Sequence, residues 1–332
     1  MTSPLVSVLM PVYNSERYLE DAIESILNQT LFDFEFLIFD DGSTDKSKEI
    51  IQKYAISDKR IKPYFSKENR GYVVHLNKGI ELARGEYIAR MDSDDISMPD
   101  RLQVQLDYLN KNSGIIICGT ESISIDENGR SLGWPKRLTE PSDLFFISFF
   151  INPLAHPTVM YSKEAIIKLG GYNPKKLPSE DYDLWTRAIL VGKLGNIDQP
   201  LLKYRQHNQS ITARKREIQR SNSNETLRTL WFDALHVELS TEETLFLRNF
   251  HKGYDMLPPN RTYALYKKLR KLKRYHKSKN SKISPASSEF YNKRVVYLLL
   301  ISRRHSFLQF SNFLVKLLCT EPLVLRNYLL NK

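Results

Sequence analysis

Residues 6–13 read VSVLMPVY, residues 34–41 read FEFLIFDD, and residues 87–95 read YIARMDSDD. Each is a short apolar run that ends in polar or acidic residues, as expected of a strand buried on both faces of a parallel sheet. Helical periodicity fills the intervals, and Ile61–Phe65 adds a further strand. This repetition of strand and helix predicts an α/β domain with a mainly parallel sheet and helices on both faces.

The strand–helix repetition gives way to a mixed pattern after about residue 114. We expect the elements of this region to be two strands over Ile115–Cys118 and Ser122–Ile125, a helix over residues 141–150, a short strand over Thr158–Tyr161, and helices over Lys163–Leu169 and Glu180–Val191.

Charge is distributed unevenly along the 332 residues, whose formal net charge is +11. Residues 1–213 carry 25 Lys and Arg against 29 Asp and Glu, whereas residues 214–332 carry 24 against 9. We therefore expect one domain over 1–213 and a basic, helical C-terminal extension over 214–332. Such asymmetry favours an anionic partner for the extension: a membrane surface, a nucleic acid or an acidic polymer.

The extension alternates cations with apolar residues at helical intervals between Arg261 and Lys282, a pattern typical of a helix that lies on anionic lipid. Arg303, Arg304, Phe307, Phe310 and Phe313 continue the same pattern. A solvated, partly packed helical extension is the alternative interpretation.

Two further expectations concern the same part of the chain. The Ser- and Lys-rich stretch Lys277–Ser288 indicates a linker, and His251 and His276 are expected at the surface.

No apolar run in the whole chain approaches the ~20 residues that span a bilayer. With only two cysteines and no signal-peptide pattern at the N-terminus, the chain is expected in the cytoplasm.

Polar clusters follow three of the predicted strands: Pro11–Asn14, Asp40–Ser43 and Asp92–Asp95. Ligands of open parallel sheets bind at the carboxyl ends of the strands. Carboxylates gathered at one edge repel each other unless a cation or donor groups join them, and Mg²⁺ and Mn²⁺ prefer oxygen ligands. The clusters predict a metal site, although Asp92–Asp95 alone would also fit a turn that caps the next helix.

The stretches VSVLMPVYN, SILNQT, FDDGSTD, GEYIARMDSDD and MPDRL together resemble family 2 glycosyltransferases, with matching order and spacing over roughly residues 4–205. The resemblance implies the GT-A nucleotide-sugar-binding fold, which is Rossmann-like. It also implies inverting, Mn²⁺- or Mg²⁺-dependent transfer of a hexose or N-acetylhexosamine from a nucleoside diphosphate sugar, with a UDP-sugar favoured. The acceptor would be a hydroxyl of a saccharide or lipid-linked glycan in cell-surface polysaccharide biosynthesis, at the inner face of the plasma membrane.

The resemblance assigns the donor site to residues at the strand ends. Tyr13 and Asp41 would hold the nucleotide base, with Pro11 in the same segment, and Asp92 would contact the ribose. Arg70 lies where the family often places a basic group near the donor, and a solvated loop cation is the alternative.

Metal binding is expected at Asp94, which would hold the Mn²⁺ or Mg²⁺ that bridges the diphosphate. His207 belongs to a Y-R-x-H element that resembles one after the family's last strand, so it would meet the metal or the diphosphate. A structural loop histidine is the alternative for His207. His156 is expected to shape the acceptor pocket.

Glu180 and Asp181 resemble the family's E-D acceptor-site signature. Inversion by single displacement needs one base to take the proton of the acceptor hydroxyl, and Asp181 is the expected base. Glu180 would orient the acceptor. The alternative is an ordinary helix N-terminus enriched in acids.

Two other classes of function remain open. A metal-dependent nucleotidyltransferase shares strand-end carboxylates, but that class usually carries a Gly-rich phosphate loop near its N-terminus, and residues 11–17 contain no glycine. A nucleic-acid-binding protein would use the basic extension but leave the acidic edge unexplained. We therefore expect no nucleic acid partner.

Overall fold

The computed structural model describes residues 3–207, 215–249, 257–258, 261–280, 284–305, 307–321 and 324. The chain forms two compact units. The first, here called the sheet unit, comprises Met1–Leu144 and Asn152–Ser223, and the second, the helical unit, comprises Phe145–Ile151 and Asn224–Lys332. The division expected after residue 213 stays a prediction.

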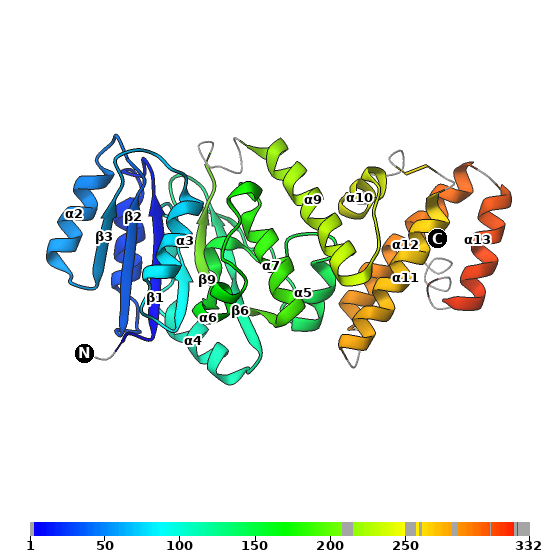
Figure 1. Cartoon of the computed structure of the whole chain (residues 1–332), viewed down its shortest axis with the longest axis horizontal. Coiled ribbons are helices and arrows are strands. Elements are labelled where there is room, and N and C mark those ends of the chain that lie inside the picture. Colours follow the sequence, from blue (N-terminus) through cyan, green and yellow to red (C-terminus); the bar gives the residue numbers. More distant parts are fainter. Residues whose placement is uncertain are drawn as a thin grey trace. The chain divides into compact units, whose positions relative to one another are not determined.

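The elements follow the chain as labelled in Figure 1. They are β1 (Val6–Val12), α1 (Leu19–Leu27), β2 (Phe34–Asp40), α2 (Ser47–Ser57), β3 (Ile61–Phe65), α3 (Tyr72–Leu82), β4 (Tyr87–Arg90), β5 (Ile96–Ser97), α4 (Arg101–Lys111), β6 (Ile115–Ile125), β7 (Ser131–Gly133), α5 (Pro141–Ile147), β8 (Met160–Ser162), α6 (Lys163–Lys168), α7 (Glu180–Val191), β9 (Lys193–Arg205), α9 (Arg216–Leu235), α10 (Thr241–Arg248), α11 (Thr262–Lys279), α12 (Pro285–His305) and α13 (Phe307–Thr320).

One sheet organises the sheet unit, with the strand order β3-β2-β1-β4-β8-β6-β9-β5 and β7 paired to β6. Strands β3, β2, β1 and β4 are parallel, and Val6 pairs with Phe34 on one side and Tyr87 on the other. Beyond β4 the sheet is mixed, because β8 runs antiparallel to both β4 and β6 while β6 and β9 are parallel. The α/β class expected from the sequence is confirmed.

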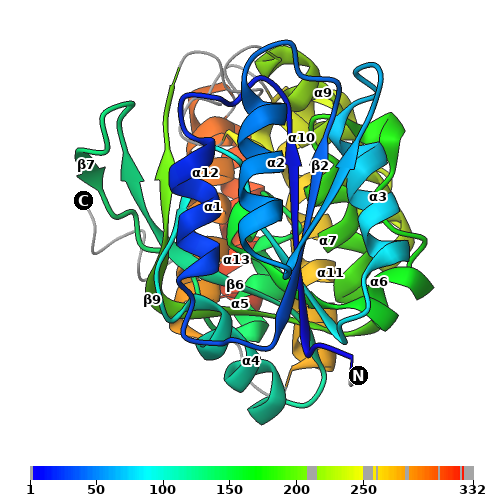
Figure 2. The ribbon, with the colours of Figure 1, turned by 90° about the vertical axis from the view of Figure 1, so that its left-hand side faces the viewer.

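Helices cover both faces of the parallel half. From β1 to β2 to β3 the chain moves across the sheet in one direction, and right-handed crossovers place α1 and α2 on the same face. From β3 to β4 the chain moves across the sheet in the opposite direction, so α3 lies on the other face. In Figure 2, β2 stands between α2 and α3. The packing of α3 is close: a Cβ at Gly79 would lie 2.2 Å from Cδ1 of Leu9 on β1, so a larger residue there would require the Leu9 side chain to move.

Four strands differ from the sequence expectation, and two of them, β5 and β7, are short strands that were not predicted. Residues Ile115–Ile125 form one continuous strand, where two were predicted, and Lys193–Arg205 forms a long strand that was not predicted. Both contain polar residues that break the apolar pattern. Glu121 in β6 is fully buried and hydrogen-bonded, so its charge does not end the strand.

The helical unit buries the apolar side of α11. Leu265, Leu269 and Leu272 are all buried, whereas Lys271 and Arg274 are exposed. The amphipathic helix expected from the sequence is present, but its apolar side packs inside the unit, so docking on lipid would have to use the cations.

His276 lies on the buried side of α11 and is 0% exposed, so the surface position predicted for it is wrong. It continues the series of Leu265, Leu269 and Leu272, which are spaced by three or four residues along one side of the helix, and this is the physical reason for its burial. His251 lies outside the described residues.

The linker expected over Lys277–Ser288 is largely wrong. Helix α11 continues to Lys279, and α12 begins at Pro285. The Ser284 hydroxyl accepts a hydrogen bond from the Ser287 N–H at 3.0 Å, so this serine caps a helix. The side chains of Arg303, Arg304, Phe307 and Phe310 lie outside the described residues. Within the described part of the chain, every helix is too short or too polar to cross a bilayer.

Candidate active site

A cleft of about 1180 Å³ opens in the sheet unit at the carboxyl ends of β1, β4 and β9. It brings together residues far apart in the sequence. The predicted site residues that line it are Pro11, Tyr13, Asp41, Asp92, Asp94, Glu180, Asp181 and His207. Open sheets place ligands at this edge because strand ends and helix N-termini converge there.

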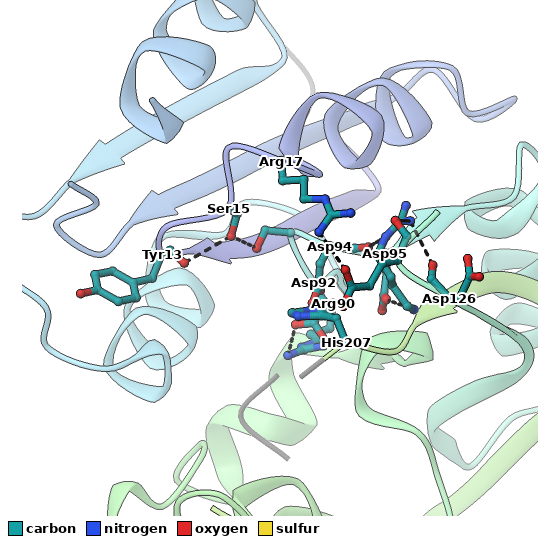
Figure 3. Close-up of polar contacts among 12 residues, drawn as sticks. Tyr13, Ser15, Arg17, Arg90, Asp92, Asp94, Asp95, Asp126 and His207 are labelled. Atoms are coloured by element: carbon teal, nitrogen blue, oxygen red, sulfur yellow. Dashed lines mark hydrogen bonds and ion pairs between the residues drawn. The ribbon is translucent and has the colours of Figure 1, made fainter. Parts of the chain in front are cut away.

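The segment after β1 is held against the segment after β2. Asn14 has a positive φ of 48°, and its Oδ1 accepts the Thr44 N–H at 2.8 Å while its own N–H donates to Ser43 Oγ at 3.0 Å. Tyr13 is left 48% exposed, and in Figure 3 its ring points away from the aspartates. An exposed ring of this kind offers a flat surface to a planar ligand.

Asp41 is buried and fixes the loop that precedes α3. Its Oδ1 accepts the Arg70 N–H at 2.7 Å and lies 2.6 Å from Nε2 of His75, and its Oδ2 accepts the Gly71 N–H at 2.9 Å. The side chain of Arg70 is exposed and is not among the groups that line the cleft. His75, which the sequence analysis missed, is the buried partner of Asp41.

Three carboxylates converge after β4. Asp92, Asp94 and Asp95 each offer an oxygen within 4.8 Å of the other two. Figure 3 shows the three side chains gathered after β4. Asp95 is 1% exposed, and among the described residues its Oδ2 has no hydrogen-bond partner. Burial, followed by the charges of Asp94 and Asp92, raises the pKa of Asp95 well above its ordinary value.

This donor set fits a hard divalent cation. All three side chains supply oxygen, the ligand that Mn²⁺ and Mg²⁺ prefer. A bound cation would also remove the repulsion that raises the pKa of Asp95 and would engage its unpaired oxygen. Asp92, which the resemblance assigns to ribose, belongs to the same cluster as Asp94.

His207 meets the cluster from the end of β9. Its Nε2 lies 2.7 Å from Asp94 Oδ2, and its ring lies 5.6 Å from that of Tyr18. Arg205, two residues earlier, braces the same loop: its Nε donates to the Asp94 carbonyl and its N–H to Asp95 Oδ1, each at 2.8 Å. The sequence analysis quoted Arg205 within a motif but gave it no role.

The acid pair occupies the first turn of α7. Asp181 Oδ2 accepts a hydrogen bond from Nδ2 of Asn152 at 2.7 Å, and Oδ1 accepts the Tyr182 N–H at the same distance. Burial raises the pKa of Asp181, while these two donors oppose the shift. The carboxylate is therefore held in one orientation at the cleft.

Glu180 is enclosed by aromatic and imidazole groups. Tyr72 Oη donates to Glu180 Oε1 at 2.7 Å, and Nδ1 of His156 lies 3.6 Å from the same oxygen. Burial, followed by the Asp181 charge, raises the pKa of Glu180 to about 7. Burial lowers the pKa of His156 well below its usual range, so this histidine is a neutral wall of the cleft.

Arg90, at the end of β4, is the most prominent residue that the sequence analysis missed. Its side chain is buried, lines the cleft and pairs with Asp92. The positive charge also acts to lower the pKa of Glu180 and of Asp181. The sequence signal that could have identified Arg90 is its position: a cationic residue at the end of an apolar strand, two residues before the acidic cluster that begins at Asp92.

The comparisons with known proteins agree with this geometry. Residues 7–170 match the family described as Glycosyl transferase family 2. An uncharacterized glycosyltransferase of Methanocaldococcus jannaschii is 39% identical over 243 residues, which cover 71% of this chain and 82% of that protein. The O-antigen biosynthesis glycosyltransferase WbnJ of Escherichia coli is 37% identical over 217 residues, covering 62% of this chain and 81% of that protein.

Among solved structures, a crystal structure of S. aureus TarS 1-349 in complex with UDP has a TM-score of 0.57 at 18% identity and covers 90% of each chain. At this identity the likeness concerns the fold, and the expected GT-A fold is confirmed. The relatives at over 30% identity and the matched family carry the further conclusion: the chain belongs to the family 2 glycosyltransferases.

Proposed function

We propose that the chain transfers a hexose or N-acetylhexosamine, with inversion, from a nucleoside diphosphate sugar to a hydroxyl of a saccharide or lipid-linked glycan in cell-surface polysaccharide biosynthesis. One observation carries the proposal: a carboxylate cluster and a separate buried acid pair face the same cleft. The similarity to WbnJ, a glycosyltransferase of O-antigen biosynthesis, supports the pathway, and the UDP bound to S. aureus TarS supports a UDP-sugar.

The donor lies along the ends of β1, β2 and β4 in this proposal. The exposed ring of Tyr13 stacks on the base, next to Pro11 in β1. Asp41 accepts from the base, and Asp92 binds the ribose hydroxyls. Arg70 contributes its backbone N–H to the orientation of Asp41.

Asp94 and His207 would hold the Mn²⁺ or Mg²⁺ beside the diphosphate, because their side chains already meet at 2.7 Å. When bound, the cation neutralises the charge that develops on the departing diphosphate. Arg205 donates a hydrogen bond to the backbone carbonyl of Asp94. This contact fixes the loop and keeps the Asp94 carboxylate in position.

In the transfer step, the acceptor oxygen attacks C1 of the sugar from the face opposite the diphosphate. The new C–O bond forms as the bond from C1 to the diphosphate oxygen breaks, and that electron pair leaves with the diphosphate. Asp181 takes the hydroxyl proton, and the Asn152 hydrogen bond and the Arg90 charge favour its ionised form. Glu180 orients the acceptor.

The basic extension is proposed to bring the enzyme to the anionic inner face of the plasma membrane. Exposed cations such as Lys267, Lys271 and Arg274 on α11 are available for that contact. Membership of the glycosyltransferase family removes the reason to consider a nucleotidyltransferase, and no nucleic acid partner is proposed.

The test is to incubate the purified full-length chain with a panel of nucleotide sugars and Mn²⁺ and to measure release of the nucleoside diphosphate. We expect slow hydrolysis of one UDP-sugar, which EDTA abolishes and added Mn²⁺ restores. UDP binding that is indifferent to EDTA would contradict the metal-dependent donor site.

A further inference from the structure

One arm of the cleft has no role in the donor site or in proton transfer. It lies where β6 and the segment after β7 form the wall, and its lining includes Ser122, Ser124, Pro135, Arg137 and Gln206. Hydroxyl and amide groups dominate here, in contrast to the carboxylates at the ends of β1 and β4. Groups that both donate and accept hydrogen bonds suit the hydroxyls of a sugar.

The segment Trp134–Arg137, here called the strap, has no regular secondary structure but is pinned to β6. The strap is held by Glu121, which is 0% exposed. Its Oε2 accepts the Trp134 indole N–H at 3.0 Å, and its Oε1 accepts the Arg137 backbone N–H at 2.9 Å and Nδ2 of Asn196 at 3.2 Å. A buried carboxylate with three donors fixes both ends of the strap.

The hydrogen bond to Glu121 leaves the Trp134 ring outside the core. The side chain is held by its N–H, yet the residue is 40% exposed. Lys136 lies 4.8 Å from the ring centroid and also pairs with Asp198 at 2.9 Å, which restrains the ring further. The cleft is lined by Pro135 and Arg137 of the strap, and the Trp134 ring next to them is orientated and exposed. Such an indole is a preformed platform, because little conformational entropy remains to be lost on binding.

We propose that the strap is the outer wall of an acceptor subsite, in which the Trp134 ring stacks on a pyranose ring of a saccharide acceptor. The C–H groups of one pyranose face are apolar and carry partial positive charge, so they pack on the electron-rich face of an indole. Ser122, Ser124 and Gln206 bind the hydroxyls at the ring edge. Glu121 is a positioning residue that acts through Trp134 and Arg137.

This inference rests on the proposed glycosyl transfer, since it names the chemistry of the acceptor for the same cleft. It requires that the acceptor presents a sugar ring to the protein, several groups away from the reacting hydroxyl. A lipid-linked acceptor without a sugar near its reacting end would not use the strap.

Fluorescence isolates this residue, because the chain has three tryptophans and the other two, Trp185 and Trp231, are both 0% exposed. Acrylamide quenching of the full-length chain therefore reports on Trp134. With UDP and Mn²⁺ saturating, we expect at least one of maltohexaose, chitohexaose and a hyaluronan hexasaccharide to reduce the quenching constant several-fold. No protection by any of the three would overturn the proposal.

Variants separate the subsite from the donor site. Trp134→Ala should raise the calorimetric Kd for the protecting saccharide about tenfold, the ratio expected for one stacked aromatic contact. Trp134→Tyr, which keeps a ring, should restore part of that affinity. Phe32→Ala, which removes a ring that is 78% exposed on another loop, should change nothing.

The Kd for UDP distinguishes the two proposals. It should be the same in the Trp134→Ala variant and in the unmodified chain, measured below the unfolding transition of both, because the variant is expected to have a lower Tm once Glu121 Oε2 has lost the indole N–H. If UDP binding weakens as much as saccharide binding, the strap belongs to the donor site and the subsite is refuted. If UDP fails to bind the unmodified chain, the proposed function fails, and the quenching experiment without UDP still tests the subsite.

Discussion

Both compact units bury arginine side chains, and the surroundings of Arg90 in the sheet unit differ from those of Arg294 in the helical unit. Arg90 in the sheet unit pairs with Asp92 and lines a cleft. Arg294 in the helical unit lies 3.5 Å from the centroid of Phe290 and 4.3 Å from that of Phe150, and its guanidinium donates to the Leu247 and Phe290 carbonyls. Burial lowers the pKa of Arg294 well below its usual range.

The comparison shows that burial of a charge does not by itself mark a site. The neighbours of Arg90 include a carboxylate that a cation or substrate could also engage, whereas the neighbours of Arg294 among the described residues include ring faces and backbone carbonyls. Charge compensation by exchangeable groups suits binding and catalysis, and compensation by packing suits stability. Changes in the sheet unit's cleft should therefore impair activity, and changes in the helical unit's core should impair stability.

Asp181→Asn gives the largest expected effect and tests the catalytic half of the comparison. The amide cannot take the acceptor proton, so the transfer rate should fall about 10³- to 10⁴-fold, the upper range for loss of a general base. UDP affinity and Tm should stay the same, as calorimetry and thermal unfolding would show. Turnover near that of the unmodified enzyme would remove Asp181 from its role.

Trp231→Ala tests the other half. Trp231 is 0% exposed, donates its indole N–H to the Phe149 carbonyl at 2.8 Å and packs edge-on against Phe149. Truncation should lower the free energy of unfolding by about 3–5 kcal/mol, measured by urea titration. The Kd for UDP below the unfolding transition should not change, and a loss of UDP affinity without a loss of stability would break the comparison.

Asp94→Ala should remove metal-dependent donor binding. Losing an oxygen ligand beside His207 should weaken UDP binding in Mn²⁺ by about 100-fold, about 2.7 kcal/mol. Calorimetry with and without EDTA measures it, and Asp126→Ala is a matched control, because Asp126 lies in the adjacent hairpin outside the carboxylate cluster. An Asp94→Ala variant with unchanged affinity would refute Asp94 as a metal ligand.

The parallel half of the sheet could be predicted from the sequence, because its strands carry a local signal. β1 and β2 are buried throughout and mainly apolar, and β3 and β4 lie within a residue of their expected ends. The aspartates at the strand ends follow from the same pattern, since the carboxyl ends of parallel strands share one edge.

The rest depends on contacts between distant residues. Glu121 and Trp134 stabilise each other through a hydrogen bond that neither residue reveals in the sequence. Without knowledge of this contact, the polar residues around Glu121 indicated a break, so β6 was predicted as two strands. Arg90 belongs to the site because Asp92 and the acid pair surround it in space. His276 is the exception: its spacing with the leucines of α11 was visible in the sequence, but its polarity was given more weight than its period.

The double variant Lys271→Gln/Arg274→Gln tests whether the helical unit has a binding role as well as a packed core. Both side chains are exposed on α11. Each cation near an anionic surface contributes about 1 kcal/mol, so binding to phosphatidylserine vesicles should weaken about 30-fold. Co-sedimentation measures it, with neutral phosphatidylcholine vesicles as control. Equal sedimentation of the variant and the unmodified chain would argue against a membrane role for α11.

Tyr72→Phe gives the smallest expected effect and tests how a hydrogen bond inside the cleft affects the pKa of Glu180. The phenol donates to Glu180 Oε1 at 2.7 Å, and this hydrogen bond lowers a pKa that burial and Asp181 raise to about 7. Without the donor, the ionised form of Glu180 loses stabilisation, so its pKa should rise further. If ionised Glu180 orients the acceptor, the acidic limb of kcat/KM should move to higher pH by less than about one unit. If Glu180 instead works in its protonated form, its higher pKa should move the alkaline limb of kcat/KM to higher pH. Limbs that stay in place would leave Asp181 as the only acid of the pair that the rate reports, and an acidic limb that moves to lower pH would contradict the role given to the Tyr72 hydrogen bond.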